Sequence, residues 1–211
     1  IQAMQTLSPS LDMVFVIISF MGQLEFYLVA LPLIYWTINE RVGLRGLIVI
    51  ASTELVTGSL KIFFRQPRPY WLGSAEALAE EASYALPSGH ASGSAAFWGY
   101  LATQFKQRNG YIVAGVIIFL VGLSRMYLGV QSLLDVLTGW ALGLGIVYAA
   151  VRLENPLRQF FSTLSLPQKV ITGLAGGLIL SMVGVLFHAL VSGTQDPAAW
   201  ASFAAEAAGS C

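Results

Sequence analysis

Six long apolar stretches constrain the fold of this 211-residue chain more than any other feature of its sequence. They lie at residues 11–38, 42–64, 89–105, 111–130, 132–151 and 170–192. About 20 helical residues cross the hydrocarbon core of a bilayer, and five of the stretches are close to that length. Only helices and closed barrels satisfy their backbone polar groups inside lipid. Because nothing alternates at period two, the pattern predicts an all-α, polytopic membrane bundle with six transmembrane helices.

The composition agrees with a surface that faces lipid. Hydrophobic residues make up 56% of the chain and charged residues 10%, whereas soluble domains are about one quarter charged. The 11 basic and 11 acidic residues cancel, so nothing suggests a nucleic-acid partner. The single cysteine, Cys211, excludes an intrachain disulfide. The bilayer is therefore the first expected partner, and the oligomeric state stays open.

The first apolar stretch is interrupted and predicts two helices instead of one. Residues 22–25, with the sequence Gly-Gln-Leu-Glu, divide it. We expect an N-terminal interfacial helix over 8–21 and a crossing over about 23–38. No repeat divides the remainder, so residues 1–211 are predicted to form a single membrane-embedded domain. The Ala-rich tail, 193–211, is expected to be interfacial or loose.

The distribution of cations predicts the orientation in the membrane. Six crossings place the connections near residues 40, 108 and 160 on one side. That side carries seven of the eleven cations: Arg41, Arg45, Lys106, Arg108, Arg152, Arg158 and Lys169. Cytoplasmic loops carry an excess of Lys and Arg, so this side is expected to be cytoplasmic. The other side, with both termini and the 65–88 loop, is then external, and we expect a bacterial inner membrane with a periplasmic site.

Polar residues gather where the apolar stretches meet this external side. They are Lys61 and Arg68 after the second stretch, Ser88, Gly89 and His90 at the third, Arg125 near the end of the fourth, and Gln131 and Asp135 at the fifth. Charge beside a membrane helix is costly and usually functional. Each residue also has a structural explanation, such as a snorkelling lysine or an Arg125–Asp135 ion pair. Their convergence on one face favours a site.

The residue types in this cluster suit a phosphate group. The guanidinium groups of Arg68 and Arg125 can bind phosphate oxygens in pairs, and Lys61 adds a point charge. A helix start at Gly89 offers free N–H groups to an anion and lets the backbone approach closely. We expect Asp135 to be the only acid beside these cations. Because the cluster lies near the bilayer surface, we expect the phosphate to be borne by a lipid.

Four further ionisable residues have open roles. His90 could protonate a leaving oxygen. Glu54 precedes Lys61 by two helical turns and shares its helix face. Glu25, near the outer end of the first crossing, could line the entrance and bind a polar headgroup. Structural hydrogen bonding is the alternative for both acids, and His188 is expected to be structural.

The cluster resembles the type 2 phosphatidic acid phosphatase superfamily, which also contains vanadium haloperoxidases and glucose-6-phosphatase. The family has three motifs. The first, Lys, six residues, Arg-Pro, is at 61–69, and the second, Pro-Ser-Gly-His, is at 87–90. The third, Ser-Arg, five residues, His, three residues, Asp, is at 124–135 with Gln131 in place of the histidine. All spacings are intact, and the motifs together are highly specific.

The resemblance implies a two-step displacement that needs no metal or other cofactor. In such enzymes the third-motif histidine attacks phosphorus and forms a phosphohistidine, which water hydrolyses. The resemblance assigns Asp135 to hold that imidazole and His90 to protonate the leaving group. Stabilisation of the transition state falls to Lys61, Arg68, Ser88, the Gly89 amide and Arg125.

Gln131 stands at the position of the histidine that acts as the nucleophile in the family. A neutral carboxamide has no lone pair basic enough to attack phosphorus, although it can hydrogen-bond Asp135 and a phosphate oxygen. The sequence therefore predicts binding without turnover. An engineered inactive variant is favoured over a natural loss of catalysis, because every other motif residue is retained.

Two classes of function follow from these observations. The first is a lipid phosphatase scaffold for a lipid phosphate or diphosphate, such as phosphatidate, phosphatidylglycerol phosphate or a polyprenyl diphosphate. The alternative is a non-catalytic receptor or carrier for anionic lipids. A vanadate-binding haloperoxidase is disfavoured because the chain is embedded in the membrane.

Overall fold

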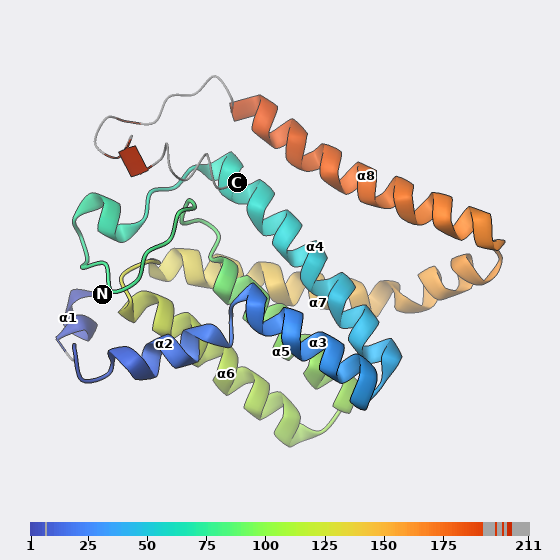
Figure 1. The fold of residues 1–211 in the computed structure, drawn as a ribbon, viewed down its shortest axis with the longest axis horizontal. Coiled ribbons are helices and arrows are strands. Elements are labelled where there is room, and N and C mark those ends of the chain that lie inside the picture. The colour runs from blue at the N-terminus through green and yellow to red at the C-terminus, as the bar shows by residue number, and fades with distance from the viewer. Residues whose placement is uncertain (7, 192–196, 198–199, 201, 204–211) are drawn as a thin grey trace.

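The computed structural model of the protein describes residues 1–6, 8–191, 197, 200 and 202–203, and these residues form a helical bundle (Figure 1). Its elements are α1 (Gln2–Gln5), α2 (Asp12–Phe20), α3 (Leu24–Thr37), α4 (Glu40–Phe64), the 3-10 helix η1 (Pro69–Leu72), α5 (Gly89–Phe105), α6 (Arg108–Tyr127), α7 (Leu133–Ser162) and α8 (Leu166–Val191). The prediction of an all-α fold is confirmed. The predicted tail lies mainly outside the described residues.

Helix α5 is the centre of the bundle and packs against α4, α6 and α7. Small residues allow the close approach of α5 and α7. A Cβ atom added at Gly143 of α7 would lie 2.3 Å from the Ser92 carbonyl oxygen and 2.8 Å from the Ala95 Cβ. Membrane helices use small residues in this way because van der Waals packing, and not water exclusion, holds them together. The contact places the start of α7 beside the start of α5.

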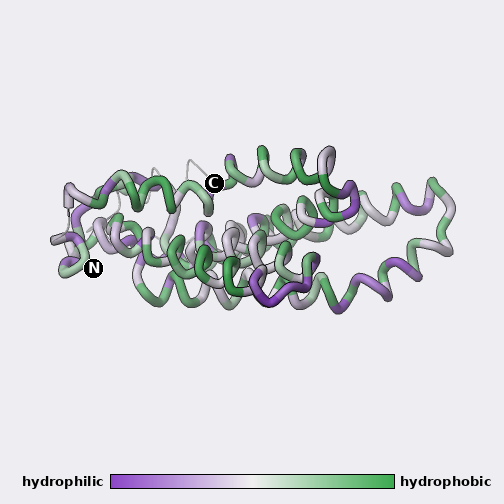
Figure 2. The backbone as a smooth tube through the Cα atoms, turned by 90° about the horizontal axis from the view of Figure 1, so that it is seen from below, coloured by the Kyte–Doolittle hydropathy of each residue, from purple (hydrophilic) through white to green (hydrophobic). Residues whose placement is uncertain are grey.

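The helices are long and apolar enough for a polytopic membrane protein. Four spans meet this description: Glu40–Leu72, Arg108–Tyr127, Leu133–Ser162 and Leu166–Leu186. A fifth results if α2 and α3, which are bent by 49°, are counted as one. The sixth predicted crossing is α5, whose 17 residues are short for a full crossing. Hydrophilic residues are concentrated toward helix ends and connections (Figure 2).

The break between α2 and α3 agrees with the predicted interruption at residues 22–25. Three consecutive turn hydrogen bonds, from Met21, Gly22 and Gln23 N–H groups to carbonyls three residues earlier, end α2 there. An interfacial position for α2 stays a prediction.

Helix α7 is longer than its apolar stretch predicts. The stretch ends near residue 151, but the helix continues to Ser162. Part of the reason is an ion pair of 2.6 Å between Arg45 of α4 and Glu154, which ties the extension to the bundle. Arg152 and Arg158 lie on this extension of α7, and their side of the membrane stays a prediction.

Candidate active site

Four helix ends and the 65–88 loop meet at one end of the bundle. The Ser88 N–H, before α5, donates to the Asp135 carbonyl oxygen on α7 at 3.0 Å. The Arg68 guanidinium reaches across to the carbonyl oxygen of Val130 at 3.0 Å. The structure thus brings together the residues predicted from the three motifs. Their functional roles stay predictions.

The start of α5 is built by Ser88 and Gly89. Ser88 is fully buried, and its Oγ accepts a hydrogen bond from the Ala91 N–H at 3.4 Å. A Cβ atom added at Gly89 would meet nothing nearer than 3.9 Å, and one of those nearest atoms is Lys61 Cε. The backbone at this helix start therefore lies beside the Lys61 side chain, with room for a methyl group between them.

The start of α7 positions residue 131. Ser132 and Asp135 form a capping box, in which Asp135 Oδ2 accepts from the Ser132 N–H at 2.6 Å. With its amide oriented so that donors face acceptors, Gln131 Nε2 donates to Asp135 Oδ2 at 3.2 Å, and Gln131 Oε1 accepts from Arg68 Nη1 at 2.8 Å. The side chain at position 131 is thus held between an acid and a cation.

Two of the cations are held by the loop itself. Arg68 has no exposed surface, and its Nε donates to the Ser83 carbonyl oxygen at 2.5 Å. Lys61 Nζ donates to Ser83 Oγ at 2.9 Å and to the Tyr84 carbonyl oxygen at 2.6 Å. Residues 83 and 84 therefore set the distance between these two positive charges.

An acid from the same loop lies among the cations. Glu81 Oε1 forms an ion pair with Arg125 Nη2 and lies 3.9 Å from His90 Nδ1. Glu81 Oε2 lies 3.5 Å from Arg68 Nη2. The expectation that Asp135 is the only acid beside these cations is wrong, because the loop folds back over the helix ends. Arg125 pairs with Glu81, while Asp135 caps α7.

The surrounding charges keep Glu81 ionised. Burial alone raises the pKa of its carboxyl group, but Arg125, His90, Arg68 and Lys61 more than offset burial and lower that pKa to about 2. At neutral pH the Glu81 carboxylate therefore compensates part of the positive charge of the cluster.

Two polar atoms in the cluster have no hydrogen-bond partner among the described residues. They are His90 Nε2 and Arg125 Nε, and both are buried. Buried polar groups in proteins nearly always have a partner. A ligand that carries hydrogen-bonding oxygens would satisfy both atoms.

A cavity of about 380 Å³ opens beside the cluster and reaches the break between α2 and α3. Its lining includes Glu25, Glu54, Lys61, Glu81, His90 and Gln131. Both acids with open roles thus border the same space as the motif residues. Arg68, Arg125, Ser88 and Asp135 do not line it and are buried behind it. The His188 side chain lies outside the described part of the chain, so its role is not settled.

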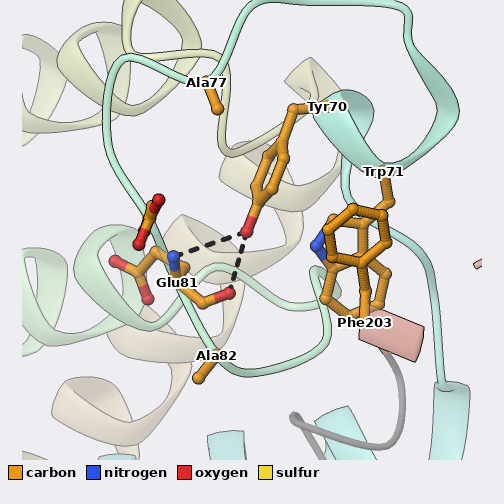
Figure 3. A pocket seen from close by; sticks show the side chains of 7 residues that line it. Tyr70, Trp71, Ala77, Glu81, Ala82 and Phe203 are labelled. Atoms are coloured by element: carbon orange, nitrogen blue, oxygen red, sulfur yellow. Dashed lines mark hydrogen bonds between the residues drawn. The ribbon is translucent and has the colours of Figure 1, made fainter.

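A second cavity, of about 480 Å³, also borders Glu81 and is lined by Tyr70, Trp71 and Phe203 (Figure 3). The Tyr70 hydroxyl donates to the Glu81 carbonyl oxygen at 3.0 Å and accepts from the Glu81 N–H at 3.4 Å. Phe203 stacks on Trp71 with ring centroids 5.6 Å apart. These contacts fix the backbone of the loop where Glu81 points into the cluster.

Sequence reasoning missed Glu81 and the backbone carbonyls of Ser83 and Tyr84. The loop has no periodicity from which the direction of a side chain could be predicted. The only signal was the position of three acids, Glu76, Glu80 and Glu81, between two cationic segments. Among the described residues, no group of three or more His, Cys, Asp or Glu side chains could hold a metal ion.

The chain is similar to known proteins over the part that contains the three motifs. The sequence profile of the PAP2 superfamily matches residues 43–159, more than half of the chain. Phosphatidylglycerophosphatase B of Bacillus subtilis (strain 168) is 32% identical over 127 residues, which are 56% of this chain and 61% of the relative. Lipid phosphate phosphatase delta of Arabidopsis thaliana is 25% identical over 169 residues, 72% of this chain and 41% of the relative. The chain thus spans about 40 to 60% of the length of these relatives.

Two solved structures share the fold. The transmembrane PAP2 type phosphatidylglycerolphosphate phosphatase from Bacillus subtilis has a TM-score of 0.62 and 28% identity, and the match covers 73% of this chain and 84% of that one. Aquifex aeolicus LpxE has a TM-score of 0.60 and 23% identity, with 68% and 87% covered. The second likeness is one of fold alone.

Proposed function

Because the chain belongs to the PAP2 superfamily, we propose that it is an integral-membrane lipid phosphatase scaffold that binds a lipid phosphate or diphosphate where α5 and α7 begin. The observation that carries this proposal is the convergence of Lys61, Arg68 and Arg125 around His90 and position 131. Two buried polar atoms without partners, on His90 and Arg125, support it. The names of the relatives agree with a phosphate-bearing lipid.

The geometry supports a displacement at phosphorus when histidine occupies position 131. Asp135 Oδ2, which accepts from Gln131 Nε2 at 3.2 Å, would accept the imidazole N–H and leave the other nitrogen free to attack. As that nitrogen bonds to phosphorus, the bond from phosphorus to the lipid oxygen breaks, and His90 gives its proton to that oxygen. Water then attacks phosphorus and gives a proton to His90, the phosphorus–nitrogen bond breaks, and phosphate and the free imidazole are released.

The amide of Gln131 removes the nucleophile and keeps the binding groups. The cations would hold the phosphoryl oxygens, and the apolar walls between helices would hold the lipid tail. Phosphatidate, phosphatidylglycerol phosphate and polyprenyl diphosphates all have this chemistry. Glu25 and Glu54 border the cavity, where they would contact a polar headgroup. The proposed site faces the external, periplasmic side, with the cation-rich connections cytoplasmic.

A second function is favoured by the same residue. Gln131 lies in an otherwise complete motif, which also fits a non-catalytic protein that binds or carries anionic lipids. In that case the cation cluster would hold a headgroup without any chemical step.

Replacement of Gln131 by histidine separates the two functions. We expect Gln131→His, in detergent micelles, to release phosphate from at least one of phosphatidate, phosphatidylglycerol phosphate and a polyprenyl diphosphate, at a rate on the order of 1 per second or faster. The Gln131 protein should release none. Phosphate release measured with a colorimetric assay provides the readout.

The matched control is the double variant Gln131→His with His90→Gln, which keeps the nucleophile and removes the proton donor. It should lose at least about a hundredfold in rate. If folded Gln131→His protein releases no phosphate from any of the three lipids, the phosphatase proposal fails and a lipid-binding or carrier protein is favoured.

A further inference from the structure

We propose that Glu81 is an internal competitor for the phosphate site: its carboxylate occupies the cation cluster in the ligand-free protein, and a lipid phosphate must displace it to bind. This inference rests on the proposed function, because it assumes that the same cations bind phosphate. It assigns a role to a residue that lies outside the three motifs.

The contacts of Glu81 are those of a ligand in the site. One carboxylate oxygen pairs with Arg125, and the other lies 3.5 Å from Arg68. Carboxylates and phosphates present oxygens to guanidinium groups in the same geometry. His90 Nδ1, on the residue expected to protonate the leaving group, is 3.9 Å from Glu81 Oε1. An incoming phosphate and the Glu81 carboxylate therefore compete for the same donors.

The backbone of Glu81 is anchored while its side chain is not enclosed. Tyr70 binds both backbone polar groups of Glu81 (Figure 3). Ser83, two residues after Glu81, is also anchored: its carbonyl oxygen and its hydroxyl group accept hydrogen bonds from Arg68. The Glu81 side chain is 25% exposed and borders the cavity of about 380 Å³. Glu81 also borders the second cavity, of about 480 Å³. Rotation of its side chain toward that second cavity would vacate both the cations and the ligand cavity without movement of the loop.

Charge explains why the occupied state is stable. The positive cluster holds the pKa of the Glu81 carboxyl group at about 2, so protonation near neutral pH does not release it. Without Glu81, Arg125 would lose the carboxylate with which it forms an ion pair. Return of the carboxylate after catalysis would also replace the departing phosphate, because it restores the same ion pairs.

A competitor that leaves the site completely has a characteristic signature. It weakens every anionic ligand by the same factor, because each ligand displaces the same ion pairs. A residue that contacted the ligand directly would instead change the affinities of different ligands by different factors.

Binding to the Gln131 protein tests this signature without turnover. The probes are dihexanoyl phosphatidate, a phosphomonoester, and dihexanoyl phosphatidylglycerol, a phosphodiester with the same tails. Isothermal titration calorimetry in detergent gives the dissociation constants. We expect Glu81→Gln to tighten both by about tenfold or more, and by equal factors, since hydrogen bonds to charged groups are worth roughly that much.

The matched control is Glu80→Gln, which removes the same charge from the neighbouring residue of the same loop and should change both constants less than about threefold. Glu81→Asp is the second variant, for use if Glu81→Gln does not fold. It keeps the charge but shortens the reach by one methylene, and it should tighten both probes to an intermediate degree.

The outcomes distinguish this inference from the proposed function. If the parent protein binds the probes in an Arg125-dependent manner but folded Glu81 variants bind them no more tightly, the competitor is ruled out and the phosphate site stands. If neither the parent nor Glu81→Gln binds either probe, the phosphate site is wrong and the competitor falls with it.

Discussion

Helices α5 and α8 are both apolar, but they differ in almost every contact. Helix α5 is surrounded by α4, α6 and α7, and Ala91, Ala95 and Ala96 have no exposed surface. Helix α8 packs mainly on α4 at the edge of the bundle (Figure 1), and Leu174 and Leu178 are each 65% exposed. Hydrophobicity in a membrane protein therefore does not predict burial. Small residues let α5 and α7 approach closely at Gly143, whereas a glycine of α8, Gly176, has no neighbour within 4 Å of an added Cβ atom.

The difference also explains where the chemistry lies. A site needs side chains held from several directions, and the start of α5 is the place where α4, α6, α7 and the 65–88 loop come together. Helix α8 has one main neighbour and faces lipid with large aliphatic side chains. Its apolar surface supports insertion in the membrane without building a pocket.

The largest expected effect comes from forcing α5 and α7 apart. Gly143→Leu would place a side chain against the backbone of α5, where even a Cβ atom would lie 2.3 Å from the Ser92 carbonyl oxygen. We expect a loss of stability of at least about 3 kcal/mol, measured by thermal unfolding in detergent.

The matched control for this prediction is Gly176→Leu in α8, where an added Cβ atom would meet nothing within 4 Å. It should change stability by less than about 0.5 kcal/mol. Equal effects of the two substitutions would remove the distinction between the buried and the peripheral helix.

An intermediate effect is expected at Arg125, which joins the buried helices to the loop. Arg125→Ala removes the partner of Glu81 and the donor to Ser19 Oγ at 2.7 Å. We expect vanadate, a phosphate analogue, to bind about 10- to 100-fold more weakly, because charged hydrogen bonds are lost. Titration calorimetry provides the measurement.

The control is Arg158→Ala on the exposed end of α7, which should leave vanadate affinity within about twofold. Unchanged affinity in folded Arg125→Ala would exclude Arg125 from the site and weaken the link between burial and binding.

The smallest expected effect is a loss of stability at low pH. The pKa of Glu81 is depressed to about 2 in the folded protein, so its ion pairs contribute stability that is fully present above the ordinary glutamate pKa of about 4.3. That contribution is lost as pH falls from about 4.3 toward 2. Between pH 7 and pH 3 we expect the parent to lose on the order of 1–2 kcal/mol more than Glu81→Gln, by thermal unfolding.

The difference between the two proteins should be constant from pH 5 to pH 8. A difference that already shrinks near pH 6 would contradict the assignment of this stability to the Glu81 carboxylate.

The sequence predicted most of the fold because helix ends carry local signals. The predicted stretch at 89–105 has the same limits as α5, which starts after a serine cap. Helix α4 begins two residues before the predicted 42, where Asn39 caps it. The end of α7 was not predictable, because its extension depends on a contact between Arg45 and Glu154 that is distant in sequence.

The motif residues were predictable for a different reason. Their spacing places them at helix ends on one side of the membrane, and the all-helical topology brings those ends together. Glu81 was not predictable because its partner Arg125 is 44 residues away and Glu81 itself lies in the 65–88 loop, outside any helix. Residues of the loop that bind through their backbone, such as Tyr84, carry no sequence signal of that role at all.

Asp135 serves two purposes with a single carboxyl group. The oxygen that receives the backbone N–H of Ser132 also receives the side chain at position 131. The cap of α7 and the orientation of residue 131 therefore depend on the same carboxyl group. A replacement of Asp135 that changes the orientation of residue 131 also loosens the first turn of α7. An inactive Asp135 variant would consequently be uninformative about chemistry until the integrity of that turn had been measured independently.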